Sequence, residues 1–402
     1  MVHGGIVPPA ETADPRRVPF CPLVPSRGMR VVVLGAGYAG VTLARRLERQ
    51  LPPEADLVVV DETGSHLVLH EVHRVVRRPS LADVITVPLD ELFDRAGIVE
   101  SRVESVDRGG RTVHLAGDEA IDYDYAAVTL GSSTAFYGLP GVREHATPLK
   151  SVGDAERIRA GFLDDVAPAG TVVVGGAGLS GVQVAGELAA LAGERDADAS
   201  VVLVEQLDEV APNFPGNFQR AVHDELEARG VDVRTGVAVE RATGDAIETA
   251  AGTIDYDQFV WTGGIAGQEA MAGERPVVRS DLRLDDRTFA LGDAARVVDG
   301  DGEAVPASAS AAIREANVAA ENLVRLVDAD LEGDEFRPRL EPYRFSVPGW
   351  IVSVGDGAVA QLGPSVLTGK AAKAMKATVG AGHLTGVGAV KNAVELVEAE
   401  LS

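Results

Sequence analysis

A six-residue glycine pattern occurs twice in this chain, about 140 residues apart. The first copy, Gly35-Ala36-Gly37-Tyr38-Ala39-Gly40, follows the apolar run Met29 to Leu34, and the second copy, Gly176-Ala177-Gly178-Leu179-Ser180-Gly181, follows Thr171 to Val174. A helical stretch and a further apolar run come after each copy. The order strand, glycine-rich turn, helix and strand is typical of a βαβ unit. The repeat therefore predicts two copies of one dinucleotide-binding fold.

The glycines of each copy have separate tasks. The first permits a tight turn, the second lets the backbone approach a pyrophosphate, and the third lets the helix pack close to the strand. The pyrophosphate then lies at the helix N-terminus, where free N–H groups favour negative charge. The next strand ends at Asp61, followed by Glu62, in the first unit and at Glu205 in the second. A carboxylate at that position can accept hydrogen bonds from a ribose diol. Glu205 also favours NADH over NADPH, because a 2′-phosphate would meet like charge.

The repeat and the chain length predict the domain organisation. A chain of 402 residues is too long for one ordinary core. The predicted fold class is α/β, with two Rossmann-like three-layer domains, the second inserted into the first, and a small C-terminal region. The expected parts are a disordered extension (1–28), a first dinucleotide-binding domain (29–150 and 273–330), a second one (151–272) and a C-terminal region (331–402). Met29 is a second candidate for the start of the chain.

Shorter patterns predict the remaining elements. The runs Ile98–Arg102 and Arg111–Leu115 are expected to form a small meander, and Ala126–Leu130 a strand that returns to the first sheet. In the C-terminal region, residues 343–363 are expected to be strands and residues 366–398 helical.

Composition excludes some partners. The chain has 61 acidic and 37 basic residues and a net charge of −24, so nucleic acid is not expected as a partner. This acidity, with only five lysines, favours adaptation to high salt, where surplus charge is screened; an ordinary acidic cytosolic protein is the alternative. Cys21 is the single cysteine, so no internal disulfide can form. The sequence has no run of about 18 apolar residues that would predict a membrane-spanning helix.

Three further stretches complete the pattern. Thr129-Leu130-Gly131 ends a strand, Thr262-Gly263-Gly264 is its counterpart in the second unit, and Gly292-Asp293 follows a later apolar run. With the glycine motifs, they make residues 29–325 resemble flavoprotein oxidoreductases that have two dinucleotide-binding domains. The resemblance implies FAD at the first site, a nicotinamide cofactor at the second, and Asp293 on the ribityl chain of FAD.

Within that group the chain is most similar to the single-subunit type II NADH dehydrogenases, which are NADH:quinone oxidoreductases. Leu69-His70-Glu71-Val72 resembles their first domain and Gly349–Gly355 their C-terminal region. The resemblance implies an enzyme that takes hydride from NADH onto flavin and passes electrons to a quinone without pumping protons. It also implies a cytoplasmic protein, peripheral on the cytoplasmic face of the membrane. A soluble NADH:acceptor reductase, serving a small acceptor or a redox protein, and a non-catalytic redox sensor are the alternatives.

The acceptor side departs from that family in two places. Gln183 stands where the family has Glu, so Glu187, one helical turn on, is the nearest residue that can carry a proton. The family's Ala-Gln-x-Ala-x-Gln-Gln is replaced by Ala-Ser-Ala-Ala-Ile-Arg-Glu at residues 309–315. Ser310 and Arg314 are then expected to donate hydrogen bonds to the quinone. Alternatively, Arg314 pairs with Glu315 on an exposed helix, away from any acceptor.

Two clusters carry weaker signals. His66, His70, Glu71 and His73 lack the spacing of a metal motif, so ordinary polar contacts and no metal are expected. Four of the five lysines, Lys370, Lys373, Lys376 and Lys391, lie among apolar residues near the C-terminus. They predict a basic surface that meets anionic lipid, with a solvated helix or one that forms a homodimer as the alternatives.

Overall fold

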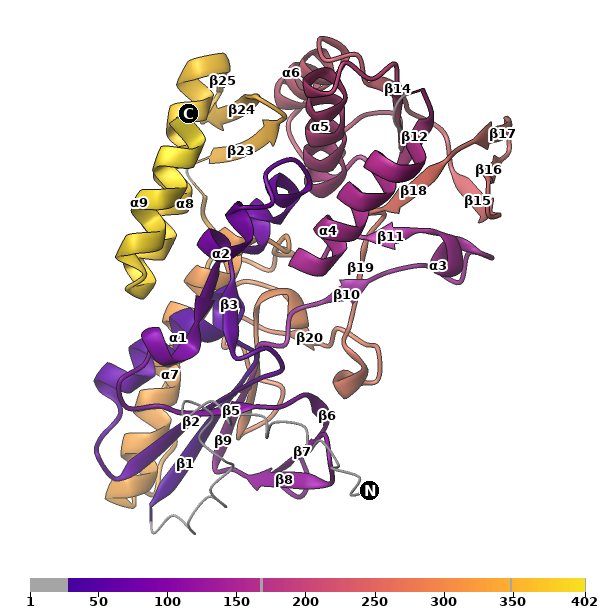
Figure 1. Cartoon of the computed structure of the whole chain (residues 1–402). Coiled ribbons are helices and arrows are strands. Elements are labelled where there is room, and N and C mark those ends of the chain that lie inside the picture. Colours follow the sequence, from indigo (N-terminus) through magenta and orange to yellow (C-terminus); the bar gives the residue numbers. More distant parts are fainter. Residues whose placement is uncertain (1–27, 167–168, 348, 402) are drawn as a thin grey trace, which may run out of the picture.

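The computed structural model describes residues 28–166, 169–347 and 349–401, so Cys21 and nearly all of the predicted extension lie outside the described residues (Figure 1). The first sheet has five parallel strands in the order β21-β9-β1-β2-β5. They are β1 (Met29–Leu34), β2 (Ala55–Asp61), β5 (Gly97–Glu100), β9 (Tyr125–Val128) and β21 (Thr288–Ala290). Since β21 follows the whole second sheet in sequence, the first sheet draws on two separate stretches of chain.

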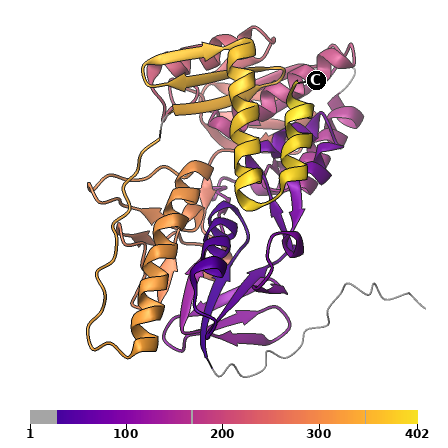
Figure 2. The ribbon, with the colours of Figure 1, turned by 90° about the vertical axis from the view of Figure 1, so that its left-hand side faces the viewer.

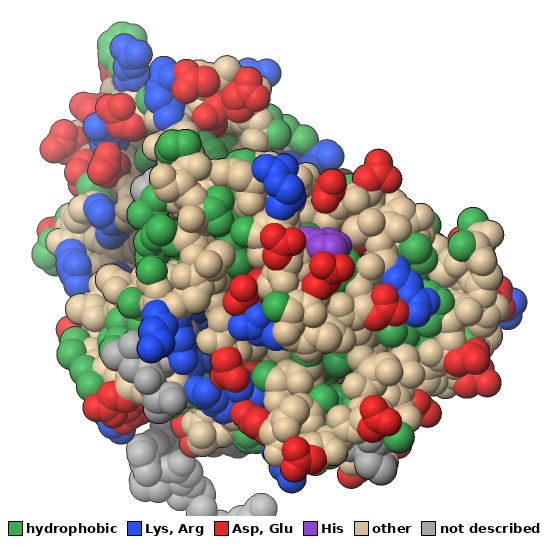
Figure 3. All heavy atoms as spheres, turned by 90° about the horizontal axis from the view of Figure 1, so that it is seen from above, with side chains coloured by type: hydrophobic (Ala, Val, Ile, Leu, Met, Phe, Trp, Pro, Cys, Tyr) green, Lys and Arg blue, Asp and Glu red, His purple; other side chains and the backbone are tan. Residues whose placement is uncertain are grey.

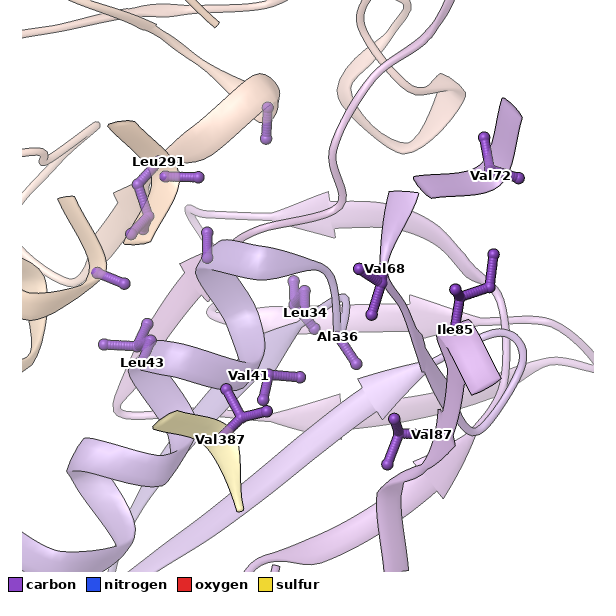
Figure 4. Close-up of a cluster of buried hydrophobic side chains, with 14 of the residues drawn as sticks. Leu34, Ala36, Val41, Leu43, Val68, Val72, Ile85, Val87, Leu291 and Val387 are labelled. Atoms are coloured by element: carbon purple, nitrogen blue, oxygen red, sulfur yellow. The ribbon is translucent and has the colours of Figure 1, made fainter. Parts of the chain in front are cut away.

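The central strands of this sheet are apolar because both of their faces are covered. Val31–Leu34 of β1 and Val58–Val60 of β2 are buried, which is the usual pattern for a parallel sheet. Helices α1 (Tyr38–Gln50) and α7 (Ala309–Glu332) pack against each other beside it. Figure 4 shows Leu34 of β1, Val41 and Leu43 of α1 and Val387 of the C-terminal region as members of one buried cluster. The first domain and the C-terminal region therefore share one core.

A small antiparallel sheet confirms the predicted meander, with one correction. Its strands are β6 (Val103–Asp107), β7 (Thr112–Leu115) and β8 (Glu119–Asp122). The run Ile98–Arg102 was expected in this meander, but β5 instead pairs in parallel with β2 at the edge of the large sheet. Val58 to Asp61 offer β5 a free edge, and the polar turn after Glu100 lets the chain leave it.

The second large sheet repeats the first. Its parallel strands, in the order β11-β18-β12-β13-β14, are β11 (Thr147–Pro148), β12 (Thr171–Gly175), β13 (Ser200–Val204), β14 (Asp232–Arg234) and β18 (Gln258–Trp261). Its helices are α4 (Val152–Gly161), α5 (Leu179–Glu194) and α6 (Gly216–Glu227), and its antiparallel hairpins are β15 (Val239–Ala242), β16 (Ala246–Thr249) and β17 (Gly252–Asp255). The predicted α/β fold with two Rossmann-like units is thus confirmed.

The C-terminal region is a three-stranded sheet followed by a helical hairpin. It contains β23 (Gly349–Val354), β24 (Gly357–Leu362), β25 (Ser365–Thr368), α8 (Gly369–Val387) and α9 (Val390–Leu401). The two helices lie side by side in Figure 2. The prediction of helix from residue 366 was early by three residues, because β25 completes the sheet first. No helix in the described ranges is long and apolar enough to cross a membrane.

Short elements connect these parts. The strands β10 (Ser133–Thr134) and β19 (Ile265–Ala266) pair where the chain crosses between the two domains. The others are β3 (Ser65–Leu67), β4 (Thr86–Pro88), β20 (Val277–Val278), β22 (Arg296–Val297), α2 (Leu81–Ile85), α3 (Val142–His145) and the short helical segments η1 (Leu69–Val76), η2 (Leu89–Glu91), η3 (Phe162–Val166), η4 (Glu269–Met271) and η5 (Gly292–Ala294). The domain limits at residues 150 and 272 stay predictions.

Candidate functional site

The first glycine loop joins β1 to α1 as a tight turn. Gly35 has φ +96°, and its N–H donates to the carbonyl of Val60 at 2.7 Å. A Cβ on Gly40 would overlap the carbonyl oxygen of Gly35, so the helix can approach the strand only with glycine there. A Cβ on Gly37 would have no protein atom within 4 Å. The space at the N-terminus of α1 is therefore open to a ligand, as a pyrophosphate site requires.

The second loop has the same backbone turn and the same hydrogen bonds as the first. Gly176 has φ +94°, and its N–H donates to Val204 at 2.8 Å. The hydroxyl of Thr262 donates to the carbonyl of Gly176 at 2.9 Å, as Thr129 does to Gly35 at 2.8 Å. Gly181 lies against Gly176 as closely as Gly40 lies against Gly35, and Gly178 again borders open space. The sequence repeat is thus a structural repeat that reaches the strand-end threonines.

The two predicted ribose acids also hold their loops. Asp61 accepts from the N–H of Ala36 at 2.8 Å through Oδ2 and from that of Thr63 at 2.9 Å through Oδ1. Glu205 accepts from Ala177 at 2.7 Å and from Leu207 at 3.0 Å, one bond to each oxygen. A carboxylate has about four acceptor sites, so both acids can still accept from a diol.

One large cavity, of about 1670 Å³, is walled by the first loop, by the start of α5 and by the C-terminal region. Drug-sized ligands occupy roughly 300–1,000 Å³, so this volume suits a dinucleotide. The predicted cofactor residues on its wall are Gly35, Gly37, Tyr38, Ala39, Asp61, Glu62, Thr129, Gly131, Leu179, Ser180, Gly292 and Asp293. Those not on its wall are Gly40, beneath the loop, and the second-loop set Gly176, Gly178, Gly181, Glu205, Thr262, Gly263 and Gly264.

Asp293 is presented to this cavity by a bonded turn. Its carboxylate accepts from the hydroxyl of Ser132 at 3.2 Å, and that hydroxyl accepts from Nζ of Lys150 at 3.1 Å. Burial lowers the pKa of Lys150, and Asp293 opposes that shift. Arg275 donates to the backbone carbonyl of Asp293 at 2.6 Å. Neither Lys150 nor Arg275 was predicted from the sequence. The rarity of lysine in this chain is a signal for Lys150, and Arg275 has none. The open loop, the helix N-terminus and Asp293 together fit FAD.

At the C-terminal side the same cavity has an apolar wall with a few protic groups. Leu69, Val72, Leu179, Ile351 and Val379 provide the apolar part. Gln183, His70, His73 and Lys376 also line the cavity. The amide of Gln183 donates to Ser353 at 3.4 Å, and Nε2 of His73 bonds the same hydroxyl at 2.7 Å. This wall suits a flat, mostly apolar molecule that carries hydrogen-bond acceptors.

A buried charge cluster adjoins this wall, and it corrects one prediction. Glu71 accepts from Arg74 and from Lys376, each at 3.1 Å, and lies 3.2 Å from Nε2 of His70. Burial would raise the pKa of Glu71, but Lys376, His70 and Arg74 hold it well below its ordinary value. Lys376 was expected on a lipid-facing surface, yet it is only 5 % exposed. Lys376 is buried because the buried carboxylate of Glu71 is stable only beside a cationic partner.

The histidines at positions 66, 70 and 73 make polar contacts, as the sequence predicts. Nδ1 of His66 bonds the carbonyl of Ala36 at 2.8 Å, and its Nε2 bonds Nε2 of His383 at 2.9 Å. The hydroxyl of Tyr38 bonds Nδ1 of His70. Burial lowers the pKa of His66 to about 4 and that of His383 to about 3, so both imidazoles are neutral at physiological pH.

The structure does not bring the predicted acceptor residues together. Of Gln183, Glu187, Ser310 and Arg314, only Gln183 lines the cavity. Glu187 is buried and accepts from Nε of Arg77 at 2.6 Å. Arg314 donates to Ser310 at 2.8 Å, because residues four apart share a helix face.

The pairing of Arg314 with Glu315 that the sequence left open does not form. Glu315 lies round the helix from Arg314, is 2 % exposed, and accepts from the backbone N–H of Gly292 at 2.6 Å.

Comparison with known proteins places this site in a family. The chain matches the pyridine nucleotide-disulphide oxidoreductase family over residues 29–316. It is 24% identical over 386 residues to a protein of Staphylococcus aureus named type II NADH:quinone oxidoreductase, covering 87% of this chain and 94% of the relative. The Staphylococcus saprophyticus protein of that name is 23% identical over 334 residues, covering 74% and 83%. These relatives agree with the resemblance read from the motifs.

Solved structures show the same fold. NDH2 from Plasmodium falciparum, in complex with NADH, superposes with a TM-score of 0.79 at 14% identity, covering 92% of this chain and 98% of that one. The sulfide:quinone oxidoreductase of Aquifex aeolicus has a TM-score of 0.75 at 19% identity, covering 91% and 92%. With the matched site and the family match over most of its length, this chain belongs to the pyridine nucleotide-disulphide oxidoreductase family.

Proposed function

We propose that this protein is an FAD-dependent NADH:quinone oxidoreductase, which oxidises NADH and passes the electron pair through bound FAD to a quinone. The observation that carries the proposal is the position of α5. Gly178 of the second glycine loop is the N-cap of this helix, and Leu179, Ser180 and Gln183 in its first two turns line the cavity of the first loop. A nicotinamide cofactor held at the second loop would thus reach a flavin held in the cavity.

FAD supplies the redox chemistry when it is bound, accepting hydride and giving up electrons. The residues of this chain bind, orient and shield. In this proposal Gly37 and Asp61 would hold the pyrophosphate and the ribose, and Asp293 the ribityl chain; the open space at Gly37 and the cavity lining support these roles. Glu205, which borders the second loop through its bond to Ala177, would select NADH by charge. No side chain has to act as a nucleophile, which agrees with a chain that cannot form an internal cysteine pair.

The apolar wall supports a quinone as the acceptor. Leu69, Ile351 and Val379 offer a surface for a flat ring, and the Gln183 amide offers a donor for a carbonyl. The relatives named type II NADH:quinone oxidoreductase agree with this choice. NADH oxidation measured with and without a short-chain quinone tests the proposal. Turnover with artificial dyes but not with the quinone would favour an NADH:acceptor reductase, and no turnover at all a redox sensor.

Exposed side chains next to the same wall support a membrane surface as the source of the quinone. Val379 of α8 lines the cavity and is 52 % exposed, and Val390 and Val394 of α9 are 56 % and 54 % exposed. Lys370 and Lys391 are exposed on these helices. Exposed apolar side chains together with lysines suit an anionic lipid surface. We propose that α8 and α9 contact it.

A further inference from the structure

Glu315 is a buried ionisable group that the proposed reaction does not use. It lies in the second turn of α7, only 2 % exposed. Its Oε2 accepts the backbone N–H of Gly292 at 2.6 Å, and no other side chain provides this N–H with an acceptor among the hydrogen bonds of the described residues. Gly292 begins η5, the turn whose next residue, Asp293, faces the cavity.

The turn is tightly confined on its other sides. Gly292 has φ +64°, which disfavours any residue with a side chain. A Cβ there would lie 3.2 Å from the Cβ of Ala39 on α1 and 3.4 Å from that of Ala312 on α7. Arg275 fixes the carbonyl of Asp293 from the far side at 2.6 Å. Glu315 therefore supplies the bond that ties this turn to α7.

Two neighbouring carboxyls meet at this turn, and their surroundings differ. Asp293 accepts from Ser132, which is in turn bonded to Lys150. Burial raises the pKa of Glu315 to about 7, with the Gly292 N–H and Arg275 lowering it and Asp293 raising it. Tyr343 also faces Glu315. Burial, and after it Glu315, raises the pKa of the Tyr343 hydroxyl. Among the described residues this hydroxyl has no hydrogen-bond partner. Burial in this turn therefore favours the protonated form of Glu315.

We propose that Glu315 is a positioning residue for the cofactor: it holds the turn that presents Asp293, and it takes up a proton when FAD binds. The inference rests on the proposed function only for the identity of the cofactor. FAD over Asp293 excludes water, which strengthens the repulsion between the two carboxylates and favours a neutral Glu315. A neutral carboxyl still accepts the Gly292 N–H through its carbonyl oxygen.

The direction of the pH effect follows from this proton uptake. Binding that takes up a proton is strongest below the pKa of the free site and weakens as the pH rises through it. FAD affinity should therefore fall between pH 6 and pH 8.5, by about fivefold or more. Glu315→Gln mimics the neutral form and keeps an acceptor for Gly292, so its affinity should not depend on pH in this range.

The test is FAD release from the diluted holoprotein, followed by the recovery of flavin fluorescence at each pH. The FAD affinity of Glu315→Gln at pH 8.5 should lie within about threefold of the wild-type affinity at pH 6. Glu315→Leu, which leaves the N–H unpaired, should release it about tenfold more readily at every pH. Glu321→Gln, the same change at an exposed site on α7, should keep the wild-type pH dependence.

Three outcomes would overturn the proposal: a wild-type affinity that is flat with pH, a Glu315→Gln variant that keeps the wild-type slope, or a folded Glu315→Leu variant that holds FAD normally. If Glu315→Leu does not fold, the slope of Glu315→Gln decides alone. Wild-type protein that binds no FAD at any pH would instead contradict the proposed function.

Discussion

Asp61 and Glu205 show how one residue can serve both the fold and a ligand. Each accepts the N–H of the residue between the first two glycines, so each holds its loop before any cofactor is present. The sequence pattern predicts only the ribose contact of these acids, because their bonds to the loop depend on the folded backbone. It means that replacing either acid disturbs the loop as well as the ligand contact.

Replacing Glu205 with Arg should change the cofactor preference. The ratio of kcat/KM for NADH to that for NADPH should fall by about tenfold or more, because a cation replaces a carboxylate near the 2′ position. The KM for NADH should also rise, since Ala177 and Leu207 lose their acceptor. Glu209→Arg, the same charge change at an exposed neighbour, should leave the ratio within about twofold. Equal wild-type efficiency with both cofactors would contradict the assignment.

Glu187 should prove structural rather than catalytic. Breaking its buried pair with Arg77 through Glu187→Gln should lower the free energy of unfolding by about 3 kcal/mol, measured by urea denaturation. Quinone kinetics should change by less than about twofold, because Glu187 does not line the cavity.

Glu194→Gln is the matched control for this pair. Glu194 also contacts Arg77, at 3.0 Å, but its side chain is 52 % exposed, so the loss should stay below about 1 kcal/mol. A selective loss of quinone turnover in Glu187→Gln, with stability kept, would restore Glu187 as a proton carrier.

Among the helices and strands, the sequence predicted those whose formation depends on neighbouring residues in the chain. The strands β1, β2, β12 and β13 are runs of valine and leucine before and after glycine turns, and they lie where periodicity put them. The edge strand β5 was misassigned, because which sheet a short strand joins depends on the edges available in the folded chain. Likewise Lys376 reads as a surface lysine until its distant partner Glu71 is known. Contacts across 305 residues leave no periodic signal.

The helices α8 and α9 can be tested as a membrane surface without unfolding the site. Val390→Asp and Val394→Asp place charge on exposed positions of α9, so binding to anionic vesicles should fall several-fold while FAD stays bound. Leu331→Asp, at an exposed position of α7, is the control and should leave vesicle binding unchanged. Sedimentation with vesicles measures the effect. Wild-type protein that never sediments at any salt concentration would contradict the proposed contact.

For the whole molecule, the net charge of −24 predicts a dependence on salt. Acidic side chains are scattered over the face in Figure 3, with basic ones between them. At molar salt the Debye length is about 3 Å, so their mutual repulsion is screened. The Tm should therefore rise by several degrees between about 0.1 M and 2 M KCl. A Tm that is unchanged or lower at high salt would contradict adaptation to high salt.

In the proposed reaction, this chain carries electrons from NADH to a quinone through one FAD. The most direct measurement is anaerobic stopped-flow mixing of the purified holoprotein, first with NADH and then with a short-chain quinone, while flavin absorbance is recorded. NADH should bleach the flavin, NADPH should do so far more slowly, and the quinone should restore the absorbance. A protein that cannot be loaded with FAD, or a flavin that NADH does not bleach, would contradict it.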